Sequence, residues 1–203
     1  MAFATYQAFR VGLQWLIEGD ELTDTFSTNV LDLIVELAES RVYRDLRAST
    51  MVTPLSVAVA SNAAALPANL IELKEVYFSG ERPLDIVPLD RLRALIADGS
   101  TAGSDAIYCA QDGDTLRFWP EATGTVLGSY YAKPAALLTA LNTTFTRYPE
   151  LFVFASLVEA MPFLGMESKV PMWDARYQRA LDDAKQDERV RVYGGGPLRM
   201  RVR

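Results

Sequence analysis

Residues 55–61 read LSVAVAS, and near this stretch the spacing of apolar residues along the chain changes. Before about Thr50, apolar side chains recur every three or four positions, which is the period of a helix. The run at 55–61 is short and rich in residue types that are typical of strands. The change predicts a helical segment followed by a β-rich one, and therefore a protein of the α+β class.

The segment before this change, residues 4–48, predicts two helices. Phe9 and Leu13 lead an apolar stripe at helical spacing. Residues 23–29, TDTFSTN, are rich in residue types that cap helix N-termini. A broad apolar face then continues to about Leu46, which predicts the second helix. The residues assigned to this face are Val30, Leu31, Ile34, Leu37, Ala38, Arg41 and Val42.

The middle of the chain predicts a small antiparallel sheet with one short helix. Asp112–Gly113 stands between two alternating runs and indicates a hairpin, because both central residues of such a turn take positive φ. Residues 88–99, PLDRLRALIADG, predict the helix, with Pro88 suited to its first turn and Gly99 to its C-cap.

The last part of the chain returns to helical spacing. Residues 147–165 predict one helix, which Pro162 should end or kink, and residues 168–188 predict another. The expected fold is a four-helix bundle of two N-terminal and two C-terminal helices, with an inserted small antiparallel β domain and an extended C-terminal tail. The expected parts are residues 1–49 as the first half of the bundle, 50–134 as the inserted β domain with one short helix, 135–188 as the second half, and 189–203 as an extended basic arm.

Composition narrows the function. The 203 residues include 20 basic and 26 acidic residues and no histidine, which removes the usual general base and the commonest metal ligand. Cys109 is single and is expected to be a small buried thiol, so the chain could fold in a reducing cytoplasm. The most apolar segment, residues 151–165, is too short to span a bilayer and is interrupted by Glu159 and Pro162, so no membrane contact is expected.

Catalytic, cofactor-binding and metal-ligating residues are not expected, and neither is enzyme activity. The candidate groups are two carboxylate pairs and a serine–lysine pair, namely Asp112 with Asp114, Asp182 with Asp183, and Ser168 with Lys169. They lie in a turn, on neighbouring positions of a charged helix and at a helix start, which favours surface and capping roles. An enzyme with an unrecognised carboxylate site remains an alternative, and it predicts a deep polar pocket with converging acids.

Several stretches, taken in order, resemble the tailed-bacteriophage head-to-tail adaptor, or connector, family. They are LIVELAESRVYRDLR (33–47) with its arginine–tyrosine–arginine signature, ALPANLIELKEVYFSG (65–80), LGSYYAKPAAL (127–137), YPELFVFASLVEAMPFL with WDARYQRALDDAK (148–185), and the terminal GGPLRMR (195–201). The resemblance implies a virion protein of the neck, at the head–tail interface, assembled in the bacterial host cytoplasm. It implies a ring of usually twelve copies that binds the portal protein and the tail or nozzle proteins. Such a ring extends the channel for DNA ejection without sequence-specific DNA binding.

The basic end of the chain, residues 189–203, is the expected partner-binding segment. It carries five arginines, and without them residues 1–188 hold 15 basic and 26 acidic residues, a net charge of −11. Apolar residues alternate with arginines, which is strand patterning, and a lone strand gains order by adding to a sheet edge of another subunit. The glycine triplet is interpreted as a hinge. The residues expected to bind the portal or a neighbouring subunit are Arg191, Val192, Tyr193, Gly194, Gly195, Gly196, Pro197, Leu198, Arg199, Met200 and Arg201.

Two other interpretations of the basic end stay open. It could be a frayed end without a role, or it could contact DNA, which would make the protein a nucleic-acid-binding module. The acidic remainder of the chain disfavours binding to phosphates. Aromatic residues on the predicted helices are interpreted as core or subunit contacts rather than a base-stacking platform; they are Trp15, Trp173, Tyr177, Phe152 and Phe154.

Overall fold

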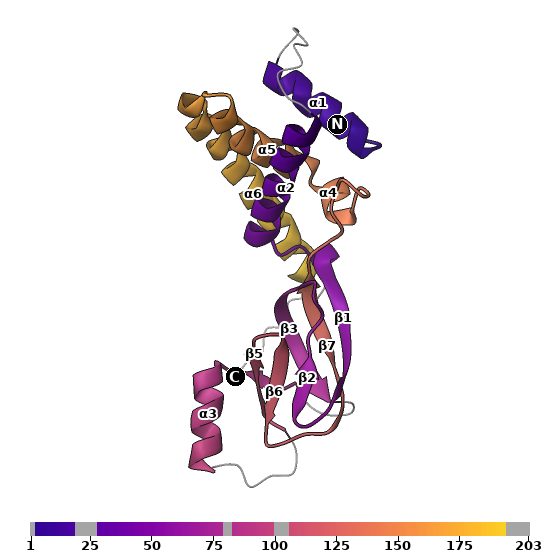
Figure 1. The fold of residues 1–203 in the computed structure, drawn as a ribbon, viewed down its shortest axis with the longest axis vertical. Helices are drawn as coiled ribbons and strands as arrows, with labels where there is room; N and C mark the ends of the chain where they lie inside the picture. Colours follow the sequence, from indigo (N-terminus) through magenta and orange to yellow (C-terminus); the bar gives the residue numbers. More distant parts are fainter. Residues whose placement is uncertain (1–2, 19–27, 79–82, 100–105, 194–203) are drawn as a thin grey trace, which may run out of the picture. The chain divides into compact units, whose positions relative to one another are not determined.

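The computed structural model describes residues 3–18, 28–78, 83–99 and 106–193 (Figure 1). The chain divides into two compact units, a helical unit of Met1–Thr50 with Pro134–Arg203 and a β unit of Met51–Lys133. The helical unit contains α1 (Tyr6–Glu18), α2 (Thr28–Asp45), α4 (Thr143–Arg147), α5 (Pro149–Phe163), the 3₁₀ turn η2 (Glu167–Lys169) and α6 (Val170–Tyr193). A second 3₁₀ turn, η1 (Ser49–Met51), spans the border between the units.

Helix α5 is the centre of the helical unit. Its residues are apolar on nearly every side, and the side chains buried within it include Leu151, Phe152 and Leu157. A helix that is apolar all round must be covered all round, and α5 packs against α2 on one flank and α6 on another (Figure 1). Three helices in contact therefore form the body of this unit.

Helices α1 and α4 extend this body at one end. The ring of Phe9 in α1 meets the ring of Phe145 in α4 edge-on at 5.0 Å, and Phe145 lies 5.2 Å from Phe152 in α5. Asn142 caps α4, because its Oδ1 accepts a hydrogen bond of 2.9 Å from the N–H of Phe145. The contact of α1 with the body runs through few residues, of which Phe9 and Leu13 are the fully buried ones.

The expected four-helix bundle is wrong, although the α+β class is right. The described residues form six α-helices and two sheets with seven strands. The prediction of a four-helix bundle was wrong for two reasons. Helix α1 has only a narrow buried stripe and packs at the end of α5, and α4 is a further short helix that precedes α5 in the chain. Apolar spacing predicts that a helix has a buried face, but not which helix covers it.

The β unit consists of two sheets that share one apolar core. Its elements are β1 (Val52–Val59), β2 (Ala63–Ala65), β3 (Leu70–Phe78), β4 (Asp85–Ile86), α3 (Leu89–Asp98), β5 (Tyr108–Asp112), β6 (Thr115–Trp119) and β7 (Gly124–Ala132). One sheet has the order β1-β7-β3 and the other β2-β6-β5-β4. The single small antiparallel sheet is therefore corrected to two, and β4 pairs with β5 in parallel. The core includes Val76, Cys109, Leu116, Phe118 and Val126, none of which is exposed.

Two turns of the β unit follow the expected local chemistry. Strands β5 and β6 form the expected hairpin, but Asp112 pairs with Thr115, so the two turn residues are Gly113, with φ +61°, and Asp114. Gly99 closes α3 in the left-handed conformation with φ +59°, as expected of a C-cap. The hairpin and the cap are confirmed, whereas the expected positive φ at Asp112 is wrong, since that residue belongs to β5 and only Gly113 of the predicted pair has positive φ.

Strand β7 is the central strand of its sheet and needs glycine at one position. A Cβ placed on Gly128 would lie 2.2 Å from the carbonyl oxygen of Glu75 in β3. Gly128 pairs with Val76, directly after the point between Leu73 and Glu75 where the β3–β7 register shifts. The absence of a side chain on Gly128 therefore permits the close approach of the two strands.

The extended C-terminal arm is wrong for its first five residues. Helix α6 continues through residues 189–193 and ends at Tyr193. A brief alternation of apolar and charged residues does not stop a long helix, because each further helical residue adds a hydrogen bond without a new nucleation cost. Residues 194–203 lie outside the described residues.

Candidate partner-binding surfaces

The buried carboxylate of Glu188 fixes the last turns of α6. Its Oε2 accepts a hydrogen bond of 2.7 Å from the backbone N–H of Ser49, and its Oε1 lies 2.8 Å from the hydroxyl of Tyr148. The same hydroxyl is 2.7 Å from Oδ2 of Asp187, and Arg147 lies 3.8 Å from Glu188 Oε1. Burial alone raises the pKa of Glu188, but these donors outweigh it and hold that pKa below its ordinary value. The end of α6 is thus tied to the residues that follow α2.

Arg41 joins the three central helices. Its guanidinium lies 2.7 Å from Glu159 of α5 and 3.5 Å from Asp174 of α6. It also stands over the ring of Tyr177 at 5.8 Å from the ring centre. The Tyr177 hydroxyl donates a hydrogen bond of 2.8 Å to Asp45 at the end of α2, so two consecutive turns of α2 are linked to α6.

Glu39 holds the segment before α4 against α2. Its Oε1 accepts hydrogen bonds from the backbone N–H of Leu137 at 2.9 Å and from the Tyr43 hydroxyl at 3.2 Å. Asn142 in turn donates to the Tyr43 oxygen at 2.6 Å. Burial and the negative charge of Glu39 raise the pKa of Tyr43, which keeps its hydroxyl protonated and able to donate.

The arginine–tyrosine–arginine stretch of α2 is therefore mainly structural. Arg41 and Tyr43 point into these networks, whereas the side chain of Arg44 is 71% exposed. Arg47 donates to the carbonyl oxygens of Tyr43 and Arg44, which satisfies two acceptors at the C-terminal end of α2. Of these residues, Arg44 is the one whose charge is largely exposed, and it lies 3.6 Å from Asp45.

The expected partner-binding residues fall in two groups. Arg191 and Val192 are exposed in the last turn of α6, and Tyr193 is the final residue of that helix. Residues 194–203, which hold the rest of the expected set, lie outside the described residues. The strand pattern proposed for 191–193 is replaced by a helix end.

Apolar residues on the exposed faces of helices were missed as candidates. Leu37 was assigned to the buried face of its helix, yet it and Leu33 are 39% and 46% exposed. Trp15 is 48% exposed, which excludes a core role in the isolated chain. The available signal was spacing: Leu33 and Leu37 stand one turn apart and off the stripe that contains Ile34.

A groove of about 270 Å³ runs between α5 and α6. Beside it, the rings of Phe154 and Trp173 stack at 6.3 Å, and the guanidinium of Arg176 lies 4.9 Å from the centre of the Trp173 ring. On α6, the groove is lined by two basic side chains in the first half of the helix and by one acidic side chain further along. Its lining consists of Glu150, Phe154, Arg176, Arg179, Ala180 and Asp183.

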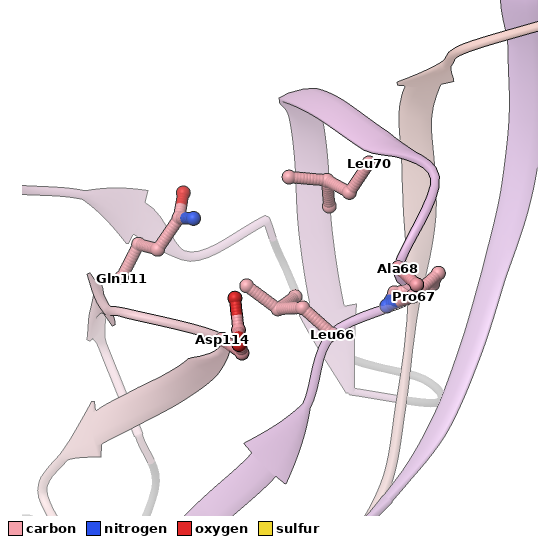
Figure 2. A pocket seen from close by; sticks show the side chains of 6 residues that line it. All are labelled: Leu66, Pro67, Ala68, Leu70, Gln111 and Asp114. Carbon is pink, nitrogen blue, oxygen red and sulfur yellow. The ribbon is translucent and has the colours of Figure 1, made fainter.

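The β unit has a pocket of about 300 Å³ between its loops (Figure 2). Its polar side chains are the carboxylate of Asp114 and the amide of Gln111, and the rest of its lining is apolar. Asp112 is instead paired with Arg117 at 2.8 Å. The pair Asp112 and Asp114 is thus not aimed at one cavity, as an acid–base pair would need to be.

The remaining chemical candidates also lie apart. Asp182 and Asp183 are both exposed on α6, and Asp183 is the one that lines the groove. Ser168 and Lys169 are exposed in η2. Within the described ranges, no three potential metal ligands are grouped, and no helix there is long and apolar enough to cross a membrane.

A family model described as SU10 adaptor protein matches residues 4–201, which is almost the whole chain. No curated protein matches the sequence. The matched range includes both compact units and all the helices and strands described above.

Proposed function

Because the chain belongs to the SU10 adaptor protein family, we propose that it works as a ring of copies between the head and the tail of a bacteriophage virion. The observation that carries this proposal is the match over residues 4–201, since both units are included. The ring binds the portal protein on one side and the tail or nozzle proteins on the other. It extends the channel through which DNA leaves the head, and its copy number is twelve.

The distribution of polar side chains supports a building block rather than a catalyst. Arg41, Tyr43 and Glu188 are directed at other helices or loops of the same unit, where they stabilise the fold. The two described pockets bring together no acid–base pair of the kind that hydrolysis needs. A closed ring repeats one contact between identical subunits, and a subunit that is held rigid by bonds within itself suits such a repeat.

The C-terminal segment is the proposed portal-docking arm. Helix α6 carries it, and the bonds of Glu188 hold the helix end in place, so Arg191 and Val192 stand at the end of a fixed support. Residues 194–203 then reach the portal or a neighbouring copy, where their arginines meet acidic groups. Passing DNA is not held, because the remainder of the chain is acidic.

The free protein is a monomer or associates weakly, and the ring forms on the portal. A stable twelvefold ring in light scattering without portal would contradict this part. The assembled protein is located in the neck of the virion, and its subunits come from the host cytoplasm.

Electron microscopy of the protein mixed with the portal of the same virus tests the proposal. The expected result is a ring of this protein on one face of the portal, and loss of binding when residues 194–203 are deleted. A full-length protein that leaves the portal bare would overturn the adaptor assignment. Undiminished binding of the truncated protein would remove only the docking arm. Salt-sensitive retention of DNA, with no portal binding, would instead favour a nucleic-acid-binding module.

A further inference from the structure

We propose that neighbouring copies join through the exposed stripe of α2 on one subunit and the α5–α6 groove of the next. The stripe consists of Leu33, Glu36, Leu37, Ser40 and Arg44, all of which are exposed. This inference rests on the proposed ring and names the two faces that form it. A head-to-tail ring needs two different, complementary faces on each subunit.

The two faces lie on different sides of the helical unit. Asp174 and Tyr177 of α6 face α2, because they contact Arg41 and Asp45. At 100° per residue, Arg176 of the groove lies about 100° around the helix axis from Tyr177, on the side away from Asp174. The groove is therefore left open when α2 packs in its own subunit.

The stripe points away from its own subunit as well. Ile34 is fully buried, and the two exposed leucines stand about 60° to 100° to one side of it around the axis of α2. Arg44 continues the same row two turns after Leu37. Two exposed leucines one turn apart, in a row that also carries an acid and a base, have the composition of a specific contact rather than of an ordinary solvated face.

The charges of the two faces match in order. Along α2 the acid Glu36 precedes the base Arg44 by eight residues, and along α6 the base Arg176 precedes the acid Asp183 by seven. These separations correspond to about 12 Å and 10.5 Å, a difference that long side chains absorb. Between the charges, Leu37 meets the apolar lining of the groove, which includes Phe154, while Leu33 lies one turn before it.

This match requires the two helices to run in the same direction, and a ring supplies that. Within one subunit α2 and α6 are parallel, because Arg41 contacts Asp174 while Asp45 contacts Tyr177 further along both helices. Adjacent copies in a ring of twelve differ by a rotation of about 30°, so α2 of one copy stays nearly parallel to α6 of the next. A copy that docked in the reverse sense would place like charges together.

Cysteine crosslinking in the full-length protein tests the contact directly. The variant Leu37→Cys/Arg179→Cys carries one exposed thiol on each face, and a short bis-maleimide should join its copies into a ladder of oligomers. Cys109 does not compete, because it is fully buried. The matched control is Leu37→Cys/Asp182→Cys, with the second thiol on another face of α6. Because the link is irreversible it also traps weak association, and a ladder no stronger than that of the control overturns the proposal.

Mixing and charge exchange sharpen the test. Equal amounts of the single variants Leu37→Cys and Arg179→Cys should give dimers and nothing larger. In the two-cysteine protein, Glu36→Arg/Arg44→Glu should lower the crosslinked yield about fivefold or more, and so should Arg176→Glu/Asp183→Arg. All four changes together should restore it, since both faces are then reversed. Two results would contradict the proposed register. One is a crosslinked yield that does not change with either exchange, and the other is a folded four-change protein whose crosslinked yield does not recover.

The matched charge control and the portal experiment separate the possible failures. Asp182→Arg/Arg189→Glu makes the same type of exchange on another face of α6 and should leave the ladder unchanged. Rings on the portal without the α2–groove crosslink would reject these two faces and leave the adaptor assignment intact. A crosslinked ladder together with a portal that binds none of this protein would support the two faces and reject the adaptor assignment.

Discussion

The hydroxyl of Tyr177 in α6 donates a hydrogen bond of 2.8 Å to Oδ2 of Asp45, the last residue of α2. Burial and the nearby carboxylate raise the pKa of Tyr177, so this hydroxyl stays protonated at all physiological pH values. The ring is fully buried, and the bond fixes where α2 ends against α6.

Replacing Tyr177 by phenylalanine should lower the free energy of unfolding by about 1–2 kcal/mol, because the ring keeps its packing while the carboxylate loses a buried donor. Urea denaturation followed by circular dichroism measures this. Tyr131→Phe in β7, outside this network, is the control and should have a smaller effect. Equal stability of the Tyr177 variant and the wild type would mean that the bond contributes nothing net.

Acid should destabilise the protein through Glu188. Its pKa is lowered in the folded state, so its contribution is present above the ordinary value of 4.5 and disappears as the pH falls below that value towards the folded pKa. The variant Glu188→Gln should be less stable at pH 7 by about 1–3 kcal/mol and should lose less stability between pH 5 and pH 3. Urea unfolding across this pH range measures both effects.

Asp182→Asn is the control for that measurement, because Asp182 is exposed on the same helix. It should leave the acid-induced loss of stability as it is in the wild type. An unchanged pH profile in Glu188→Gln would show that other carboxylates dominate the acid response.

Gly128→Ala should destabilise the β unit by about 1–3 kcal/mol or more, because the new Cβ would meet the carbonyl oxygen of Glu75 at 2.2 Å. Ser129→Ala in the same strand removes a hydroxyl without a clash and is the matched control. Thermal unfolding of the two variants provides the comparison. Equal melting temperatures would indicate that β3 moves away at little cost.

Cys109 should react with thiol reagents only when the protein unfolds. Burial and the nearby charge of Asp85 raise its pKa to about 12, so the reactive thiolate is scarce as well as shielded. Labelling with a chromogenic disulfide should be slow in native protein and complete within minutes in denaturant. Rapid native labelling would place the thiol at the surface.

Sequence patterns succeeded where local chemistry decides the structure. The hairpin at Asp112–Gly113 and the cap at Gly99 depend on backbone angles that few residues adopt, so two or three residues were enough to locate them. The burial of Cys109 followed in the same way from its place in an apolar strand. The alternation between helical and β-rich segments was equally visible in the spacing of apolar residues.

Patterns failed where tertiary packing decides. Nothing in the spacing of α1 shows that it packs at the end of α5 rather than beside α2. The residues after Glu188 alternate like a strand, yet they continue α6 because the helix before them is already formed. Leu37 looked like a core residue because apolar character alone does not say which side of a helix is covered.

The anchor formed by Ser49, Tyr148 and Glu188 also has a mechanical meaning. A pull on the chain beyond Tyr193 can peel away the last turn of α6, residues 189–193, but then meets the two short polar contacts of Glu188. Load is therefore shared by α6, by the start of α5 and by the residues after α2, instead of being carried by a single tether.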